Sequence, residues 1–118
     1  MRVTLYGIAN CDKVRAARNW LAQRGVEAGF HDFKQHGVTP VLLAGWLKQL
    51  EWTELVNRRG TTWKRLPEAR RSGVTSAAAA SALMLDQPSV IKRPVIDLDG
   101  KLHPGFDADA YSRLFGKS

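Results

Sequence analysis

The spacing of hydrophobic residues changes along the chain, and its first part predicts a β-α-β unit. Apolar and polar positions alternate over residues 2–7, which is typical of a strand, and a stripe at helical spacing runs from about Cys11 to Arg24. Gly25 provides a stop for that helix. Residues 26–33 then predict a second strand. Two strands joined by one helix are expected to be parallel, with a right-handed crossover.

The middle of the chain predicts helices. Thr39 is placed to cap a helix that begins at Pro40, because proline has no N–H to leave unsatisfied there. Three short segments follow that we expect to be helices or turns, the last of them basic: 51–57, 60–66 and 67–73. Thr75 then predicts the cap of an alanine-rich helix that ends near Asp86.

The last part returns to strands. Pro94 is acceptable as the first residue of a strand that continues to residue 98, and Asp99-Gly100 is a two-residue hairpin signal. The chain returns through residues 101–103. Asp107 is placed to cap a final helix. This part predicts β-β-α.

The predicted fold class is α/β. The order β-α-β, helical insert, β-β-α is typical of a thioredoxin-like fold with an enlarged middle. We expect a single domain, residues 1–118, with its core at about 1–38 and 88–118 and its insert at about 39–87. A chain of 118 residues can bury a core without disulfides or metals.

The cysteine content and the lack of long apolar runs indicate the cellular compartment in which the protein is expected. No apolar run approaches the roughly 20 residues that span a bilayer, and we expect no signal peptide and no membrane association. A single cysteine cannot form an internal disulfide. Together these features predict a cytoplasmic protein.

The chain is strongly basic, with a net charge of +7 and a pI near 10.1. Its cations concentrate in three pairs, Arg58-Arg59, Lys64-Arg65 and Arg70-Arg71. Such pairs can form a solvated face, a nucleic-acid surface or a site for an anionic small molecule. Cations that converge on a thiol favour the small anion, and we do not expect a nucleic-acid partner.

Cys11 is the candidate nucleophile. It is expected where a strand ends and a helix begins, so backbone N–H groups and the helix dipole would favour its thiolate. Arg15, four residues later, would add a cation on the same helix face, whereas Asp12 would oppose the thiolate. The alternative is that Cys11 is a small buried hydrophobe, which is the ordinary state of a lone cysteine.

Other polar residues give weaker signals. Asn10 can donate a hydrogen bond near the thiol, although a loop asparagine more often serves a turn. The three histidines, His31, His36 and His103, have no metal-ligand spacing with the cysteine. We therefore expect no metal site and no bound cofactor.

Several motifs together resemble one family. Tyr6-Gly7 followed by Cys11 and Arg15, and the segment Ile91-Lys92-Arg93-Pro94-Val95-Ile96 after a helical insert, resemble the arsenate reductase-related (ArsC-like) proteins of the Spx/YffB group. Residues 57–66, Asn-Arg-Arg-Gly-Thr-Thr-Trp-Lys-Arg-Leu, resemble its YffB branch. The likeness covers essentially the whole chain.

The resemblance implies a thioredoxin-like fold and a binding site built from arginines. Pro94 would be the cis-proline that faces the thiol, and Arg93 would hold an anionic substrate. Arg58 or Arg59 would correspond to the arginine of the insert, although Asn57 competes in a different register. A third arginine would fall near residues 103–105, where this chain has none, and this departure argues against arsenate reduction.

A second departure concerns the resolving thiol. Redox-sensing members carry a Cys-x-x-Cys pair, but position 14 here is Val14. An oxidised Cys11 would therefore need an external thiol, for which glutathione is the obvious co-substrate. We expect a glutathione-dependent thiol-disulfide reductase that acts on a small anionic or disulfide substrate, with glutaredoxin or another protein as a further partner. The alternatives are an Spx-like protein-binding module and an arsenate reductase proper.

Overall fold

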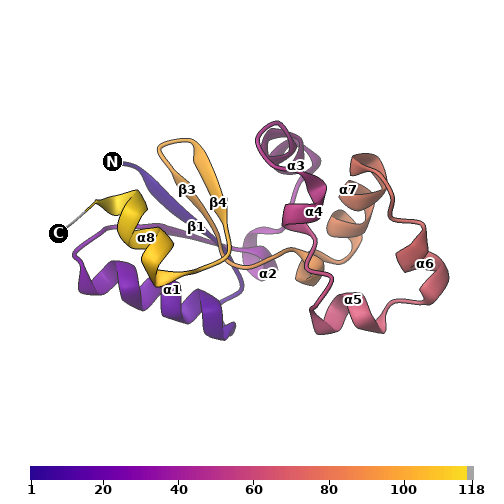
Figure 1. Cartoon of the computed structure of the whole chain (residues 1–118), viewed down its shortest axis with the longest axis horizontal. Helices are drawn as coiled ribbons and strands as arrows, with labels where there is room; N and C mark the ends of the chain where they lie inside the picture. Colours follow the sequence, from indigo (N-terminus) through magenta and orange to yellow (C-terminus); the bar gives the residue numbers. More distant parts are fainter. Residues whose placement is uncertain (117–118) are drawn as a thin grey trace. The chain divides into compact units, whose positions relative to one another are not determined.

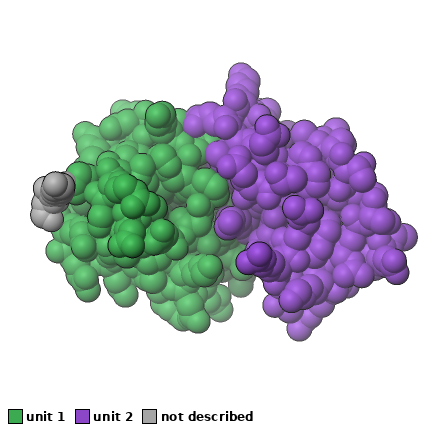
Figure 2. Space-filling view, viewed as in Figure 1, with its two compact units in different colours: residues 1–36, 93–118 green, residues 37–92 purple. Residues whose placement is uncertain are grey.

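The computed structural model describes residues 1–116, and its chain forms two compact units (Figures 1 and 2). Unit 1 comprises residues 1–36 and the chain from residue 93 onward, and unit 2 comprises residues 37–92. The predicted insert, 39–87, lies within unit 2. In the described chain no helix is long and apolar enough to cross a membrane.

Unit 1 contains a sheet and its helices. In chain order its elements are β1 (Val3–Gly7), α1 (Asp12–Gln23), β2 (Gly29–Asp32), α2 (Phe33–His36), β3 (Val95–Leu98), β4 (Lys101–Pro104) and α8 (Ala108–Phe115). The strands lie in the order β2-β1-β3-β4. β1 is parallel to β2 and antiparallel to β3, and β3 is antiparallel to β4. The predicted thioredoxin-like fold is confirmed.

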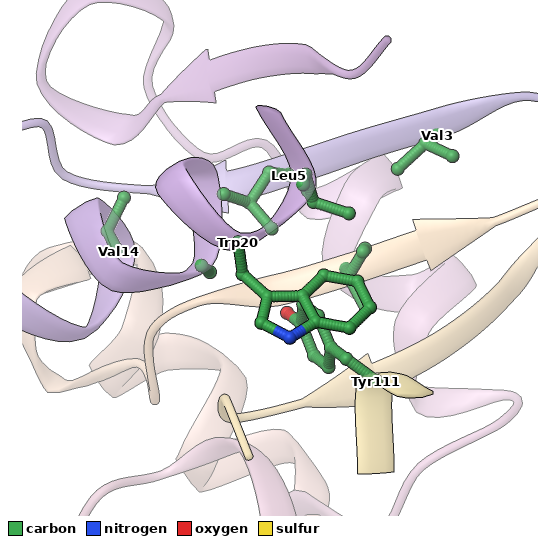
Figure 3. Close-up of a cluster of buried hydrophobic side chains, with 8 residues drawn as sticks. Val3, Leu5, Val14, Trp20 and Tyr111 are labelled. Atoms are coloured by element: carbon green, nitrogen blue, oxygen red, sulfur yellow. The ribbon is translucent and has the colours of Figure 1, made fainter. Parts of the chain in front are cut away.

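The core of unit 1 lies where α1 and α8 cover one face of the sheet (Figure 3). Leu5 and Ile96 face each other across β1 and β3, and both are buried. Figure 3 shows Trp20 of α1 against Tyr111 of α8, and their rings meet edge to face with centroids 5.5 Å apart. The predicted apolar stripe of α1 is the buried one: Val14, Ala17, Trp20 and Leu21.

β2 is shorter than predicted, and the ends of its neighbouring helices explain the difference. Gly25, with φ of 68°, ends α1, and the N–H groups of Gly25 and Val26 donate to the carbonyls of Ala22 and Leu21. Val26 therefore completes a helix end of the Schellman type rather than starting a strand. At the other end, the Asp32 carboxylate accepts from the Lys34 N–H and α2 begins.

Unit 2 is mainly helical, as predicted. Its elements are α3 (Pro40–Leu47), α4 (Trp52–Leu55), α5 (Thr61–Arg65), α6 (Glu68–Ser72), α7 (Ala77–Asp86) and the 3-10 helix η1 (Pro88–Val90). Thr39 caps α3 by accepting from the Leu42 N–H at 3.1 Å. The prediction of a Thr75 cap on α7 is wrong: Ser76 accepts from the Ala79 N–H, and α7 starts one residue later.

An isolated β-bridge within unit 2 holds the backbone of the segment that precedes Arg93. Val56 and Ile91 form an antiparallel bridge. The Asn57 N–H donates to the Val90 carbonyl at 2.8 Å, and the Lys92 N–H donates to the Leu55 carbonyl at 2.7 Å. The residues that lead into the Arg93–Pro94 turn are therefore held by backbone hydrogen bonds.

Candidate active site

Cys11 is the N-cap residue of α1. β1 ends at Gly7, and the Cys11 N–H donates to the Ile8 carbonyl at 3.3 Å, which closes the turn between strand and helix. Cys11 has extended backbone angles, and its carbonyl accepts the first helical hydrogen bond from the Arg15 N–H. The thiol is partly exposed. The strand–turn–helix placement predicted for this cysteine is therefore observed.

The environment of Cys11 favours the thiolate. Burial is the largest single influence and raises the thiol pKa, but the Val14 N–H, the Arg93 side chain and the Lys13 N–H together outweigh it. Among residues 1–116 no strict capping hydrogen bond reaches the sulfur, so the two N–H groups act as nearby dipoles at the helix N-terminus. The net result is a Cys11 pKa below its ordinary value. A lowered pKa is the condition for a reactive cysteine at neutral pH.

Arg93 approaches this thiol from the loop before β3, and Pro94 directly follows it. Arg93 is half-buried, and both a hydrogen bond and its charge lower the pKa of Cys11. The Arg93–Pro94 peptide bond is cis, as the resemblance implied. The Gly105 N–H donates to the Pro94 carbonyl at 2.7 Å, which ties this loop to the end of β4. The residue after Arg93 is thus held by a backbone hydrogen bond within unit 1.

Arg15 has a different partner from the one predicted. Its guanidinium donates to the Asp12 carboxylate on the exposed surface of α1. The two side chains are 55% and 94% exposed, so solvent screens their charges. In residues 1–116 the charge that lowers the Cys11 pKa comes from Arg93. Asn10 lies exposed in the turn that precedes Cys11.

Arg58 and Arg59 belong to unit 2, where a tight turn presents both. The Asn57 side chain accepts from the Arg59 N–H at 3.2 Å, and the Gly60 N–H donates to the Asn57 carbonyl. The Arg58 guanidinium lies 5.9 Å from the centroid of the Trp52 ring. Both arginines are exposed. Their assignment to the thiol site stays a prediction.

The region that would hold a third arginine adjoins Pro94. His103 is half-buried on β4 opposite Ile96, and Gly105, with φ of 83°, follows the strand. An imidazole cannot bind an anion through two parallel N–H donors as a guanidinium does. In the described part of the chain, His, Cys, Asp and Glu side chains form no group of three or more that could hold a metal ion.

Two contributors to the site were missed from the sequence. Val14 was identified as part of the apolar stripe and as the position that lacks a resolving cysteine, yet its backbone N–H also lowers the Cys11 pKa. Gly7 was identified only as part of the motif, yet the fully buried Val14 packs directly against it. The available signal was a glycine at the last position of a strand, followed by a β-branched residue in the first turn of the next helix.

Comparison with known proteins identifies relatives along nearly the whole chain. Residues 6–114 match the model of the ArsC family. An uncharacterized protein of Haemophilus influenzae is 39% identical over 113 residues, which cover 96% of this chain and 98% of the relative.

Solved structures agree with this match. The structure of a YffB protein is similar with a TM-score of 0.88 and 42% identity, covering 94% of this chain and 96% of that one. An arsenate reductase (ArsC) related protein from Brucella melitensis is similar with a TM-score of 0.79 and 49% identity, covering 98% and 95%. The similarity therefore extends over both units.

Proposed function

The chain belongs to the ArsC family, and from that premise we propose that it is a glutathione-dependent thiol-disulfide reductase with Cys11 as its nucleophile. The observation that carries the proposal is the pairing of Cys11 with Arg93 and with the N–H groups of Lys13 and Val14, which lowers the thiol pKa. Because Cys11 is the only cysteine in the chain, the second thiol must come from outside.

The proposed reaction has two exchange steps. The Cys11 thiolate attacks the glutathione sulfur of a mixed disulfide, RS–SG, and a Cys11–glutathione disulfide forms while RS⁻ leaves and takes up a proton. A second glutathione thiolate then attacks the glutathione sulfur of that adduct. Oxidised glutathione leaves, and the Cys11 thiolate is restored. The sum is RS–SG plus GSH giving RSH plus GSSG, so atoms and electrons balance.

The anionic character of glutathione fits the cations of this chain. We assign Arg93 to one carboxylate of the bound tripeptide, because a guanidinium can hold a carboxylate in a bidentate pair. Arg58 or Arg59 is proposed for the other carboxylate on the resemblance alone. Arg15 and Asn10 are proposed as further contributors, with Arg15 acting only when it leaves Asp12.

Turnover with glutathione as the sole reductant tests this proposal. We expect the wild-type protein to reduce the mixed disulfide of glutathione and cysteamine, and mass spectrometry to detect one glutathione on Cys11 during turnover. Cys11→Ser is expected to lose both signals. An adduct that forms but is not released by glutathione would contradict the proposed donor, and no adduct at all would contradict the proposed nucleophile.

A protein-binding module is the second candidate function, and the surface charge of unit 2 favours it. Six of the seven charged residues in segment 58–71 are basic. Within residues 1–116, Arg70 pairs with Asp86, whereas the other five cations of the segment have no carboxylate within ion-pair distance: Arg58, Arg59, Lys64, Arg65 and Arg71. Surface cations that lack such partners can attract an acidic protein segment.

Binding of an acidic peptide separates the two candidates. If the module is correct, a fluorescent poly-glutamate peptide should bind equally well to wild type and Cys11→Ser, and the variant Lys64→Glu/Arg65→Glu should bind about tenfold more weakly. Lys101→Glu/Arg113→Glu is the matched control, because it makes the same charge change in unit 1. If both double variants bind the peptide equally weakly, the loss comes from net charge alone, and a specific site in unit 2 is contradicted.

A further inference from the structure

We propose that Gly7 and Val14 are positioning residues for the thiol. The missing side chain at Gly7 lets Val14 pack against the end of β1, and this contact holds the first turn of α1 with its N–H groups near the Cys11 sulfur. The inference rests on the proposed function only in that both concern the same thiol.

The contact leaves no room for a larger residue. A Cβ built on Gly7 would lie 2.6 Å from Val14 Cγ2 and 3.5 Å from Val14 Cγ1, and the first distance is shorter than real Cβ atoms show. Val14 is fully buried. As a β-branched residue in a helix, it keeps essentially one rotamer and cannot swing away. An added methyl group at position 7 must therefore displace the backbone at this contact, either at the end of β1 or at the first turn of α1.

That turn carries the donors. The N–H groups of Lys13 and Val14 both lower the pKa of Cys11. Attraction between an N–H and a sulfur anion weakens steeply as distance and angle depart from their best values. A displacement of a few tenths of an ångström at Val14 would move the two donors together, since they belong to the same rigid turn.

The charged side chain that acts on Cys11, Arg93, does not belong to this turn. Arg93 reaches the sulfur from the loop before β3, and Asp12 and Arg15 pair on the exposed side of α1. Gly7 has no backbone angle that requires glycine, since its φ is not among the positive values of residues 1–116. Alanine at position 7 therefore tests the steric contact with Val14 without adding strain to the backbone angles of residue 7.

The test is the thiol pKa, followed through the ultraviolet absorbance of the thiolate as a function of pH. We expect Gly7→Ala to raise the pKa by about half a unit to one unit toward the ordinary value near 8.5. We expect Gly7→Ala/Val14→Ala to bring the pKa back close to the wild-type value, because the second change removes the methyl group that collides while keeping the N–H. Melting temperatures are measured in parallel.

The rescue distinguishes positioning from stability. The double variant is expected to be less stable than wild type, because it loses buried apolar volume, and yet to have the wild-type pKa. If Gly7→Ala does not fold, Val14→Ile replaces it, since it adds one methylene at the same contact and is expected to raise the pKa in the same direction. An unchanged pKa in the folded single variant, or a double variant that is not restored, would overturn the inference. A wild-type thiol that titrates at the ordinary value would instead contradict the proposed function.

Discussion

At the scale of single residues, two arginines are candidates to act on Cys11, and the structure distinguishes them. Arg93 forms a hydrogen bond with the thiol and also acts through its charge. Arg15 is committed to Asp12 on the exposed surface of the helix. Helical spacing predicted that Arg15 would serve the thiol, and Asp12 was considered only for its effect on the thiolate, although its position three residues before Arg15 is also that of a helical ion pair.

The first prediction compares these two arginines. Arg93→Ala should raise the Cys11 pKa by about one unit, because it removes a hydrogen bond and a nearby charge. Arg15→Ala should change the pKa much less, because an exposed ion pair is strongly screened. The rate of alkylation of Cys11 as a function of pH measures both shifts, and equal shifts in the two variants would be inconsistent with the geometry.

A second residue-scale feature is the buried hydroxyl of Tyr111. The side chain is 1% exposed, and its oxygen has no hydrogen-bond partner among residues 1–116. Burial raises the pKa of this hydroxyl, so it stays neutral at physiological pH. The ring, in contrast, has packing partners, since it contacts the rings of Trp20 and Phe106 edge to face.

Removal of that hydroxyl should therefore do no harm. We predict that Tyr111→Phe leaves the free energy of unfolding unchanged or raises it by up to about 1 kcal/mol, because a buried polar group without a partner costs desolvation energy. Tyr111→Ala, which also loses the ring contacts, should cost about 3 kcal/mol or more. Urea unfolding measures both, and a large loss in Tyr111→Phe would show that the hydroxyl has a partner after all.

At the scale of elements, the hydrophobic pattern predicted which segments are strands and which are helices. It did not predict all of their ends, because capping hydrogen bonds determine where a helix begins. α1 and α8 start where predicted because Cys11 and Asp107 directly precede their apolar stripes. The start of α7 was missed by one residue because Thr75 and Ser76 are both good caps. Neighbouring capping residues cannot be distinguished from the sequence alone.

The cap of α7 gives a prediction with a built-in control. Ser76→Ala should lower the free energy of unfolding by about 1 kcal/mol, because it removes the acceptor for the Ala79 N–H. Thr75→Ala should change it by no more than a few tenths of that, as expected for an exposed residue outside the cap. Chemical denaturation of the two variants provides the comparison. A larger loss in Thr75→Ala than in Ser76→Ala would contradict the observed cap and support the one predicted from the sequence.

At the scale of the whole molecule, the order of elements was accessible from the sequence because each part of the chain carries local signals, which are hydrophobic spacing at its two ends and caps and helix formers in its middle. Alternation in residues 2–7 and helical spacing in α1 identify β-α-β, and Asp99-Gly100 identifies the final hairpin, where both residues have positive φ. The approach of Arg93 to Cys11 was not accessible from patterns, because 82 positions separate them along the sequence. Only the resemblance to a family supplied that pair.

The surroundings of the thiol also show what patterns leave out. The contact between Gly7 and Val14 depends on how closely α1 approaches β1, and a distance of that kind has no periodic signature. The backbone donors of Lys13 and Val14 are likewise independent of side-chain identity. The place of Cys11 between strand and helix could therefore be predicted from the sequence, whereas most of the groups that lower its pKa could not.

The central claim is an activated thiolate at Cys11, and the pH dependence of its reaction with oxidised glutathione tests it most directly. Because the folded protein lowers the thiol pKa, the thiolate should persist as pH falls below the ordinary thiol pKa. Intact-mass measurements should then show a single glutathione adduct forming readily at about pH 7, with a half-maximal rate clearly below about pH 8.5. A rate that rises only around the ordinary pKa, and is the same in Arg93→Ala, would contradict the account.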